Sequence, residues 1–395
     1  MWSYFKFEFK QFITSKKNLA IYFLLLCMSC YYAISIAPNY EPIENADIDV
    51  IKASYETKGD FIKRFEDGEY LAPESFMAYD IYKYWNELDG KRIEAYEADD
   101  FPAFAETTAE WYIYADSQIN SNSNLYYNSR YYNFGNTYAK EDGHYGYLYS
   151  ASRYTDYAYG DSKLSINVFE ERTVLQTLQR LFESYLPYVL LLGCILLAID
   201  IVLKDRKNPT VMRGFPISMW QKLLGKGSVA FIGSLLMFVP LAVGLIIIGI
   251  RYGFGEFQLP VPIYSLTEQN FYNITMGNYL FQNVRLISCW FLLLISLILF
   301  LSIVIKVEFA NLIAGVALIL WEYFYYYRGL GFVKDVHWYP STYTKVGQVI
   351  SGYRNFLYNT EGISLENGMM LLRSCAIVLL VLTLIISSFK KYKLF

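Results

Sequence analysis

The sequence predicts a membrane α-helical protein with six transmembrane helices, an N-terminal interfacial helix and a large mixed α/β extracellular domain between helices 1 and 2. Six long apolar stretches divide the chain, and each is close to the ~20 residues that a helix needs to cross a ~30 Å hydrocarbon core. Lys and Arg concentrate on alternate sides of these stretches, including both chain ends. By the positive-inside rule both termini are therefore cytoplasmic, and the long segment 38–184 faces outward.

The N-terminal segment 1–17 mixes aromatic residues with four lysines. This mixture favours a helix in the cytoplasmic interface, with rings among the headgroups and cations toward anionic lipid, although a plain basic flank stays open. The first apolar stretch is interpreted as a retained helix, because Ile36-Ala37-Pro38 is a poor signal-peptide cleavage site. The six predicted membrane helices are Asn18–Ala37, Tyr185–Leu203, Val229–Ile250, Leu286–Ile305, Ala310–Tyr327 and Leu371–Ser388.

The predicted extracellular domain, 38–184, is acidic. It holds 27 Asp and Glu against 13 Lys and Arg, a net charge of −14, whereas the rest of the chain has a net charge of +11. The overall charge of −3 therefore says nothing about the partners of either part. Apolar spacing predicts helices at Ile48–Phe65, Pro73–Trp85 and Val168–Phe182.

Thirteen tyrosines lie between Trp111 and Gly160. Tyrosine favours strands and is also common at binding surfaces, where its ring offers contact area at low entropic cost. A loop-rich structural cover is the alternative. The candidate substrate surface consists of Tyr126, Tyr127, Tyr131 and Tyr132.

Two acidic residues lie in or beside the apolar stretches. Asp200 is near the cytoplasmic end of the second, and Glu322 lies past the middle of the fifth. Acids within a membrane are costly and often functional, although pairing with a basic neighbour explains them equally. The remaining predicted segments are the cytoplasmic loop 204–228, the extracellular segments 251–285 and 328–370, the cytoplasmic turn 306–309 and the cytoplasmic tail 389–395.

The sequence contains none of the common catalytic or metal-binding motifs. It has no phosphate-binding loop, no Gly-x-Ser-x-Gly and no metalloprotease pair. Only two histidines are present, and all five cysteines lie in apolar stretches, so a metal site is not expected. The chain is therefore predicted not to be an enzyme and to carry no cofactor of its own.

The cytoplasmic loop carries a recognisable pattern. An acid–basic–polar–Thr stretch (Asp205, Arg206, Asn208 and Thr210) follows the second apolar stretch, and a Pro-x-Ser turn and a lysine then lead into the third. Ser218 and Gln221 are spaced as a capping box at the start of a helix. Together with the topology, this loop resembles that of the permease subunits of ABC type-2 exporters. Pro209 and Met219 depart from the family pattern, in which Gly and Arg are common at these places.

This resemblance implies a bacterial cytoplasmic-membrane permease that exports a peptide or amphiphile. It implies two ABC ATPase subunits, a second permease subunit and membrane lipid as partners, with ATP and Mg in the ATPase; no nucleic acid is expected. ATPase coupling would fall to the segment 1–17, to the turn 306–309 and to one set of loop residues. These residues are Asp205, Arg206, Lys207, Thr210, Pro216, Ser218, Lys222 and Lys226.

Two other interpretations remain open. A membrane sensor or scaffold would use the Tyr-rich domain to bind an outside ligand, and it would have no ATPase partner. A membrane-embedded transferase would need acids at its outer face, for which Glu322 and the acids of the extracellular domain are the candidates. Neither the cargo, the identity of the second permease nor the direction of transport follows from the residues themselves.

Overall fold

The computed structural model describes residues 1–43, 47–70, 72–122, 125–207, 217–328 and 335–389. The chain divides into two units, which are described separately. The first unit comprises 1–38, 177–251 and 279–395, and the second comprises 39–176 and 252–278. Helix α8 (Val174–Glu183) crosses the boundary between them.

The first unit is a bundle of apolar helices. Five are long and apolar enough to cross a membrane: Lys16–Asn39, Leu186–Asp205, Met219–Tyr252, Met276–Val304 and Leu365–Ser388. A shorter apolar helix covers Glu308–Leu320. Its helices are α1 (Trp2–Ile13), α2 (Lys16–Tyr31), α9 (Leu186–Ala198), α11 (Met219–Leu235), α12 (Phe238–Tyr252), α13 (Met276–Val304), α14 (Glu308–Leu320), α15 (Glu322–Tyr325), α16 (Val346–Ile350), α17 (Tyr353–Tyr358) and α18 (Leu365–Ser388).

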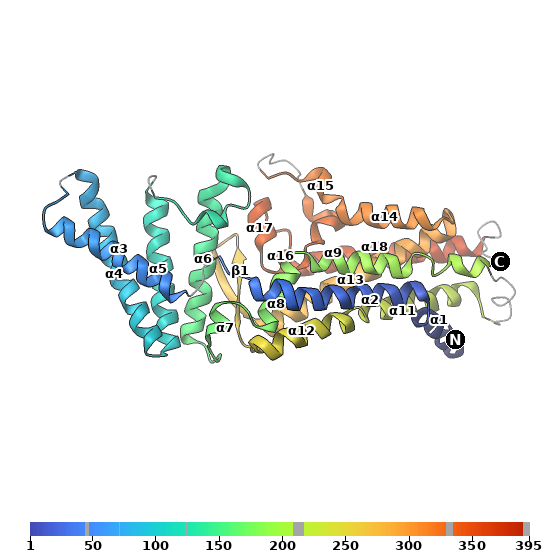
Figure 1. The fold of residues 1–395 in the computed structure, drawn as a ribbon. Coiled ribbons are helices and arrows are strands. Elements are labelled where there is room, and N and C mark those ends of the chain that lie inside the picture. Colours follow the sequence, from blue (N-terminus) through green and yellow to red (C-terminus); the bar gives the residue numbers. More distant parts are fainter. Residues whose placement is uncertain (44–46, 71, 123–124, 208–216, 329–334, 390–395) are drawn as a thin grey trace. The chain divides into compact units, whose positions relative to one another are not determined.

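Within this unit α9 and α13 are central, since two-thirds of each apolar segment is buried, whereas α2 and α18 are mostly exposed. In Figure 1, α1, the start of α11 and the end of α18 lie at one end of this unit. The fifth predicted helix, Ala310–Tyr327, is divided in the structure. Helix α14 ends at Leu320, Trp321 follows, and α15 is a single turn.

The described part of the predicted segment 328–370 forms short helices that pack inside the first unit. These are η6 (Val336–Trp338), η7 (Pro340–Tyr343), α16 and α17, and they precede α18. Tyr343, Thr344 and Val346 are buried, and the Trp290 indole of α13 donates to the Tyr343 carbonyl at 2.9 Å. Non-helical backbone at membrane depth is tolerated only where protein buries it or it lines a cavity. Burial of this segment is consistent with that requirement.

The second unit is a row of antiparallel helices with one β-hairpin. Each of α3 (Ile48–Glu66), α4 (Pro73–Glu97), α5 (Phe101–Ser121) and α6 (Ala139–Tyr159) packs on the next, and α6 also packs on the hairpin (Figure 1). Short helices complete it: η3 (Ser129–Tyr131), η4 (Gly135–Tyr138) and α7 (Ile166–Phe169). The hairpin joins β1 (Pro260–Ser265) to β2 (Asn270–Thr275), with Pro260 opposite Thr275.

The mixed α/β prediction for 38–184 differs from this arrangement. The described residues of that segment are helical, and the two strands come from the predicted extracellular segment 251–285. The Tyr-rich stretch forms α5 and α6, because its rings pack between helices. Tyr112, Tyr147 and Tyr154 are buried and stack edge to face or tilted against one another. Tertiary packing thus outweighs the strand preference of tyrosine.

Candidate functional site

A cluster of four charged side chains, three of them buried and Lys204 half-buried, lies at the α1 end of the first unit. The Lys226 ammonium is 2.9 Å from Glu8 Oε2 and 3.0 Å from Asp205 Oδ1. Lys204 is 3.6 Å from Glu8 Oε2. Glu8 is 0%, Lys226 1% and Asp205 5% exposed. We call these four residues the Glu8 cluster; they come from α1, from the turn η5 (Leu203–Lys207) and from α11.

The α1 sequence places Glu8 on the buried face of its helix. Tyr4, Glu8 and Phe12 are four residues apart, so they lie on one face, and all three are buried. Helix α1 approaches α11 closely because α11 has glycines at the contact. A Cβ at Gly225 would lie 3.2 Å from the Tyr4 ring, and a Cβ at Gly233 would overlap the Phe12 ring.

Helix α11 carries Lys226 into the cluster from the other side. The predicted capping box is present at its start, where the Ser218 N–H donates to Gln221 Oε1 at 3.0 Å. Lys222 precedes Lys226 by about one turn and is also buried. The cap therefore sets the register that turns both lysines toward η5 and α1.

The Glu8 cluster has two carboxylates and two ammonium groups, so its net charge is zero. Desolvating charges is costly, and a buried ionic group is tolerated when it is paired and hydrogen-bonded. Burial, and then the charges of Glu8 and Asp205, raise the pKa of the Tyr4 hydroxyl well above its usual range. Tyr4 therefore stays neutral beside the carboxylates, and the cluster remains balanced only while all four charges are present.

A second ion pair joins the two segments that also supply the Glu8 cluster: Lys17 follows α1, and Asp200 precedes η5. Lys17 pairs with Asp200, and its ammonium also donates to the Leu196 carbonyl at 2.7 Å, near the C-terminus of α9. A cation at a helix C-terminus complements the helix dipole. Asp200 therefore has a basic partner in the structure, but the partner is Lys17 rather than the basic residues that follow Asp200 in sequence.

The other predicted coupling residues are described only in part. The backbone of Arg206 and Lys207 lies in η5, and their side chains lie outside the described residues. Thr210 and Pro216 also lie outside the described residues. The predicted turn 306–309 presents Val307 and Phe309 as exposed side chains.

Glu322 belongs to a buried ionic group at α15. The Arg354 guanidinium of α17 pairs with it, and the Tyr358 hydroxyl donates to Glu322 Oε1 at 2.6 Å. Arg354 is buried and also donates to the Thr342 carbonyl at 3.5 Å. The group joins the short helix after α14 to the buried segment before α18, and it gives Glu322 a specific role in packing.

The four predicted substrate-surface tyrosines do not form one exposed surface. Tyr126 is 79% exposed, whereas Tyr127 is buried and donates to Asp116 Oδ1 at 2.7 Å. Tyr131 stacks on Tyr147, and the Tyr132 hydroxyl donates to the Tyr127 carbonyl at 2.8 Å. Burial is the main reason why the pKa of Tyr127 lies well above its usual range. Their contacts agree with the structural alternative: Tyr127 is buried, Tyr131 and Tyr132 are half-buried, and Tyr126 is exposed.

Sequence reasoning missed Glu8 and Arg354. The signal for Glu8 was an acid on the Tyr4–Phe12 face of an otherwise aromatic and basic helix, which requires a buried cation. Arg354 had no local signal, because its partner Glu322 is far away in sequence and the intervening segment has no helical periodicity.

The described residues contain no group of three or more His, Cys, Asp or Glu side chains that could hold a metal ion. Comparison of the chain with protein-family models, with curated proteins and with solved structures found no match. The chemistry of the site therefore has to be judged from the residues themselves. The Glu8 cluster can tie three segments together and respond to their displacement.

Proposed function

We propose that the chain is the permease subunit of an ATP-driven ABC exporter in a bacterial cytoplasmic membrane. A peptide or an amphiphile is the proposed cargo, and a separate subunit would hydrolyse ATP. The observation that supports this most is the Glu8 cluster. It joins the N-terminal helix to the beginning of the 204–228 loop through Lys204 and Asp205, and to the helix that ends the loop through Lys226.

The physical argument concerns how a push from a partner would reach the helices. Lys204 and Asp205 follow α9, which is central in the first unit, and Lys226 lies on α11. A partner that pressed on the loop or on α1 would displace all three segments together, because the cost of separating buried charges resists independent movement. A coupling element needs segments that move together as one body, because continuous deformation between them would absorb the push.

The proposed topology has six crossings with both termini cytoplasmic and residues 38–184 outside. The sixth crossing would be α14 with its continuation through Trp321 and α15. At 1.5 Å per residue, Glu308–Tyr325 would reach about 27 Å, close to the thickness of the hydrocarbon core. The even number of crossings agrees with α1 and the end of α18 lying at one end of the first unit (Figure 1).

The test is purification of the tagged chain, in mild detergent, from the organism that encodes it, so that its natural partners are present. Co-purifying proteins are identified by mass spectrometry, and ATPase activity is measured on the eluate. A stoichiometric ATP-binding subunit is expected, with activity that falls when Lys226→Met disrupts the cluster. Lys63→Met, an exposed lysine on α3 outside the proposed coupling segments, is the matched control and should leave activity unchanged.

Absence of an ATPase from the purified, folded chain would contradict the proposal. It would instead favour the sensor or scaffold, for which the second unit would be the next target. An ATPase that co-purifies equally with wild type and Lys226→Met, and retains full activity, would leave the exporter standing but remove the coupling role of the cluster.

A further inference from the structure

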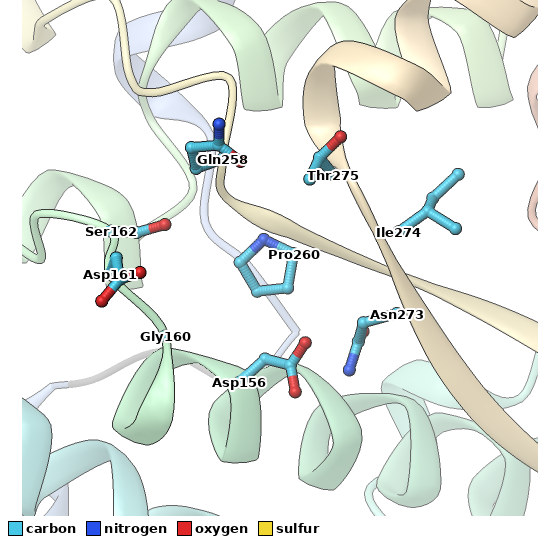
Figure 2. Close-up of a pocket in the computed structure, with 9 residues that line it drawn as sticks. All are labelled: Asp156, Gly160, Asp161, Ser162, Gln258, Pro260, Asn273, Ile274 and Thr275. Carbon is cyan, nitrogen blue, oxygen red and sulfur yellow. The ribbon is translucent and has the colours of Figure 1, made fainter.

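The second unit has a polar cavity of about 470 Å³ between the end of α6 and the hairpin. Figure 2 shows Asp156 of α6 beneath the first residues of β1, with Asn273 beside it and Gln258 and Thr275 on the opposite side. Its lining residues are Asp156, Gly160, Asp161, Ser162, Gln258, Pro260, Asn273, Ile274 and Thr275. A volume of this size is within the range of small-molecule sites.

The cavity is acidic and rich in hydrogen-bond acceptors. The nine lining residues include two carboxylates and no basic side chain. A third acid, Glu256, lies two residues before the lining residue Gln258 and accepts from the Lys163 backbone N–H at 3.1 Å. The basic residues nearest along the chain are Lys163, which is exposed, and Arg153, which pairs with Glu171. The local charge therefore favours a positively charged occupant.

Asp156 occupies a position that its own helix makes unfavourable for an acid. It is in the last turn of α6, where Gly160 N–H bonds to its carbonyl at 2.9 Å. Carboxylates are disfavoured at the C-terminus of a helix by the helix dipole. Among the described residues Asp156 has no ion pair. Burial raises its pKa above the usual range, and the neighbouring Asn273 amide opposes this only in part.

Asn273 is a lining residue whose side-chain oxygen has no hydrogen-bond donor among the described residues. Its side-chain N–H donates to the Ser152 carbonyl at 3.1 Å and to the Ser152 hydroxyl at 2.9 Å, which fixes the orientation of the amide. Its Oδ1 atom is buried and has no hydrogen-bond partner among the described residues. A buried acceptor without a donor is costly and is explained by a missing partner.

We propose that this cavity binds the primary ammonium group of a small organic ligand, with Asp156 as its main counter-charge. An ammonium group supplies three donors and a positive charge, which match the Asp156 carboxylate and the unsatisfied Asn273 Oδ1. A bare metal ion fits less well, because the lining has only two carboxylates and the cavity is much larger than an ion. The inference does not rest on the exporter proposal.

Free diamines and lysine-containing peptides share this chemistry, and the experiment separates them. Binding of cadaverine and of the dipeptide Lys-Lys to the full chain in detergent is measured by isothermal titration calorimetry. The neutral control is 1,5-pentanediol, which has nearly the shape of cadaverine without its charge. At least one of the two amines is expected to bind, and the diol is not expected to bind. Tighter binding of cadaverine would indicate a free diamine as the ligand, and tighter binding of Lys-Lys would indicate a lysine-containing peptide.

The variants test the residue that carries the proposal. Asp156→Asn keeps the shape of the side chain and should weaken amine binding about tenfold or more, the effect of losing one charge-assisted hydrogen bond. Asp161→Asn should weaken binding less, because Asp161 is exposed. Asp67→Asn, an exposed acid of the same unit at the end of α3, should have no effect.

Several results would overturn the proposal. Equal binding of 1,5-pentanediol would indicate a hydroxyl-binding site, and binding of calcium chloride alone would indicate a metal site. Unchanged amine affinity in Asp156→Asn, with the thermal unfolding curve showing a folded protein, would remove Asp156 from the site. Binding of neither amine would exclude an ammonium site.

Discussion

The Glu8 cluster makes a quantitative prediction about charge balance. In Lys226→Met the two carboxylates lose a cation that lies 2.9 and 3.0 Å away, and the cluster acquires a net charge of −1. Removing one partner of a buried ion pair costs about 3–5 kcal/mol. Because Lys204 remains 3.6 Å from Glu8, the lower end applies, about 3 kcal/mol.

The second variant, Glu8→Gln, leaves a net charge of +1 but keeps the Lys226–Asp205 pair. Lys226 and Lys204 then face a neutral amide in place of a carboxylate, and weakening one charge-assisted contact in this way should cost about 2 kcal/mol. The double variant, Lys226→Met with Glu8→Gln, keeps only the charges of Asp205 and Lys204, so the cluster is neutral again. It should therefore cost about 3 kcal/mol rather than the additive value of about 5 kcal/mol. The expected coupling between the two sites is therefore about 2 kcal/mol.

The assay is equilibrium unfolding in mixed micelles, with helix content followed by circular dichroism as a denaturing detergent is added. Lys10→Met controls for loss of an exposed lysine from α1 and should change the free energy of unfolding by less than about 0.5 kcal/mol. Additivity of the two single variants within about 0.5 kcal/mol would refute the reasoning, because independent sites behave in that way.

Three further predictions concern packing and buried charge. Gly143→Ala should destabilise the protein by about 1–3 kcal/mol in the same unfolding assay, because a Cβ there would overlap the base of the Tyr127 ring. Asp156→Asn should raise the unfolding temperature without added ligand. This gain should develop as the pH rises from about 3.9 through the raised pKa of Asp156, and stay constant above it. Arg354→Met should cost about 3–5 kcal/mol in the unfolding assay, since it leaves Glu322 buried without its cation.

For each of these three predictions, a further variant or measurement defines the result that would contradict it. Gly59 lies inside helix α3, and a Cβ there would meet only Asn86 Nδ2 at 3.7 Å, an ordinary contact. Gly59→Ala should therefore stabilise slightly, and equal effects at both glycines would refute the overlap argument. A gain for Asp156→Asn at low pH only would reverse the expected sign. For Arg354→Met, adding Glu322→Gln should recover part of the loss, and a double variant as unstable as the sum would show that the pair does not interact.

The membrane helices were predictable because hydropathy acts locally. A stretch of about 20 apolar residues has few alternatives to a helix in lipid, whatever the rest of the chain does. The five long apolar helices contain or closely match five of the six predicted stretches. The predicted helices at Ile48–Phe65 and Pro73–Trp85 are likewise confirmed as α3 and α4. The capping box at Ser218 was predictable for the same reason, since both of its partners lie within one turn.

Other features depended on contacts between distant segments. Tyrosine-rich sequence favours strands in isolation, but here the rings fill the space between α5 and α6, and packing determined the outcome. The break between α14 and α15 at Trp321 could not be predicted from hydropathy. Its structural partner is Arg354, which pairs with Glu322, and only the folded chain brings these two residues together.

The sequence by itself determined that this is a membrane protein with a polar segment between its first two apolar helices, because the cost of exposing apolar residues to water depends on composition and order alone. The tertiary structure decided which charges meet. Glu8, Asp205 and Lys226 come from three separate segments, and only close packing of α1 on α11 at Gly225 and Gly233 brings them within hydrogen-bonding distance. Within one helix the spacing of charges predicts which of them pair, but for charges on segments far apart in the chain only three-dimensional proximity decides it.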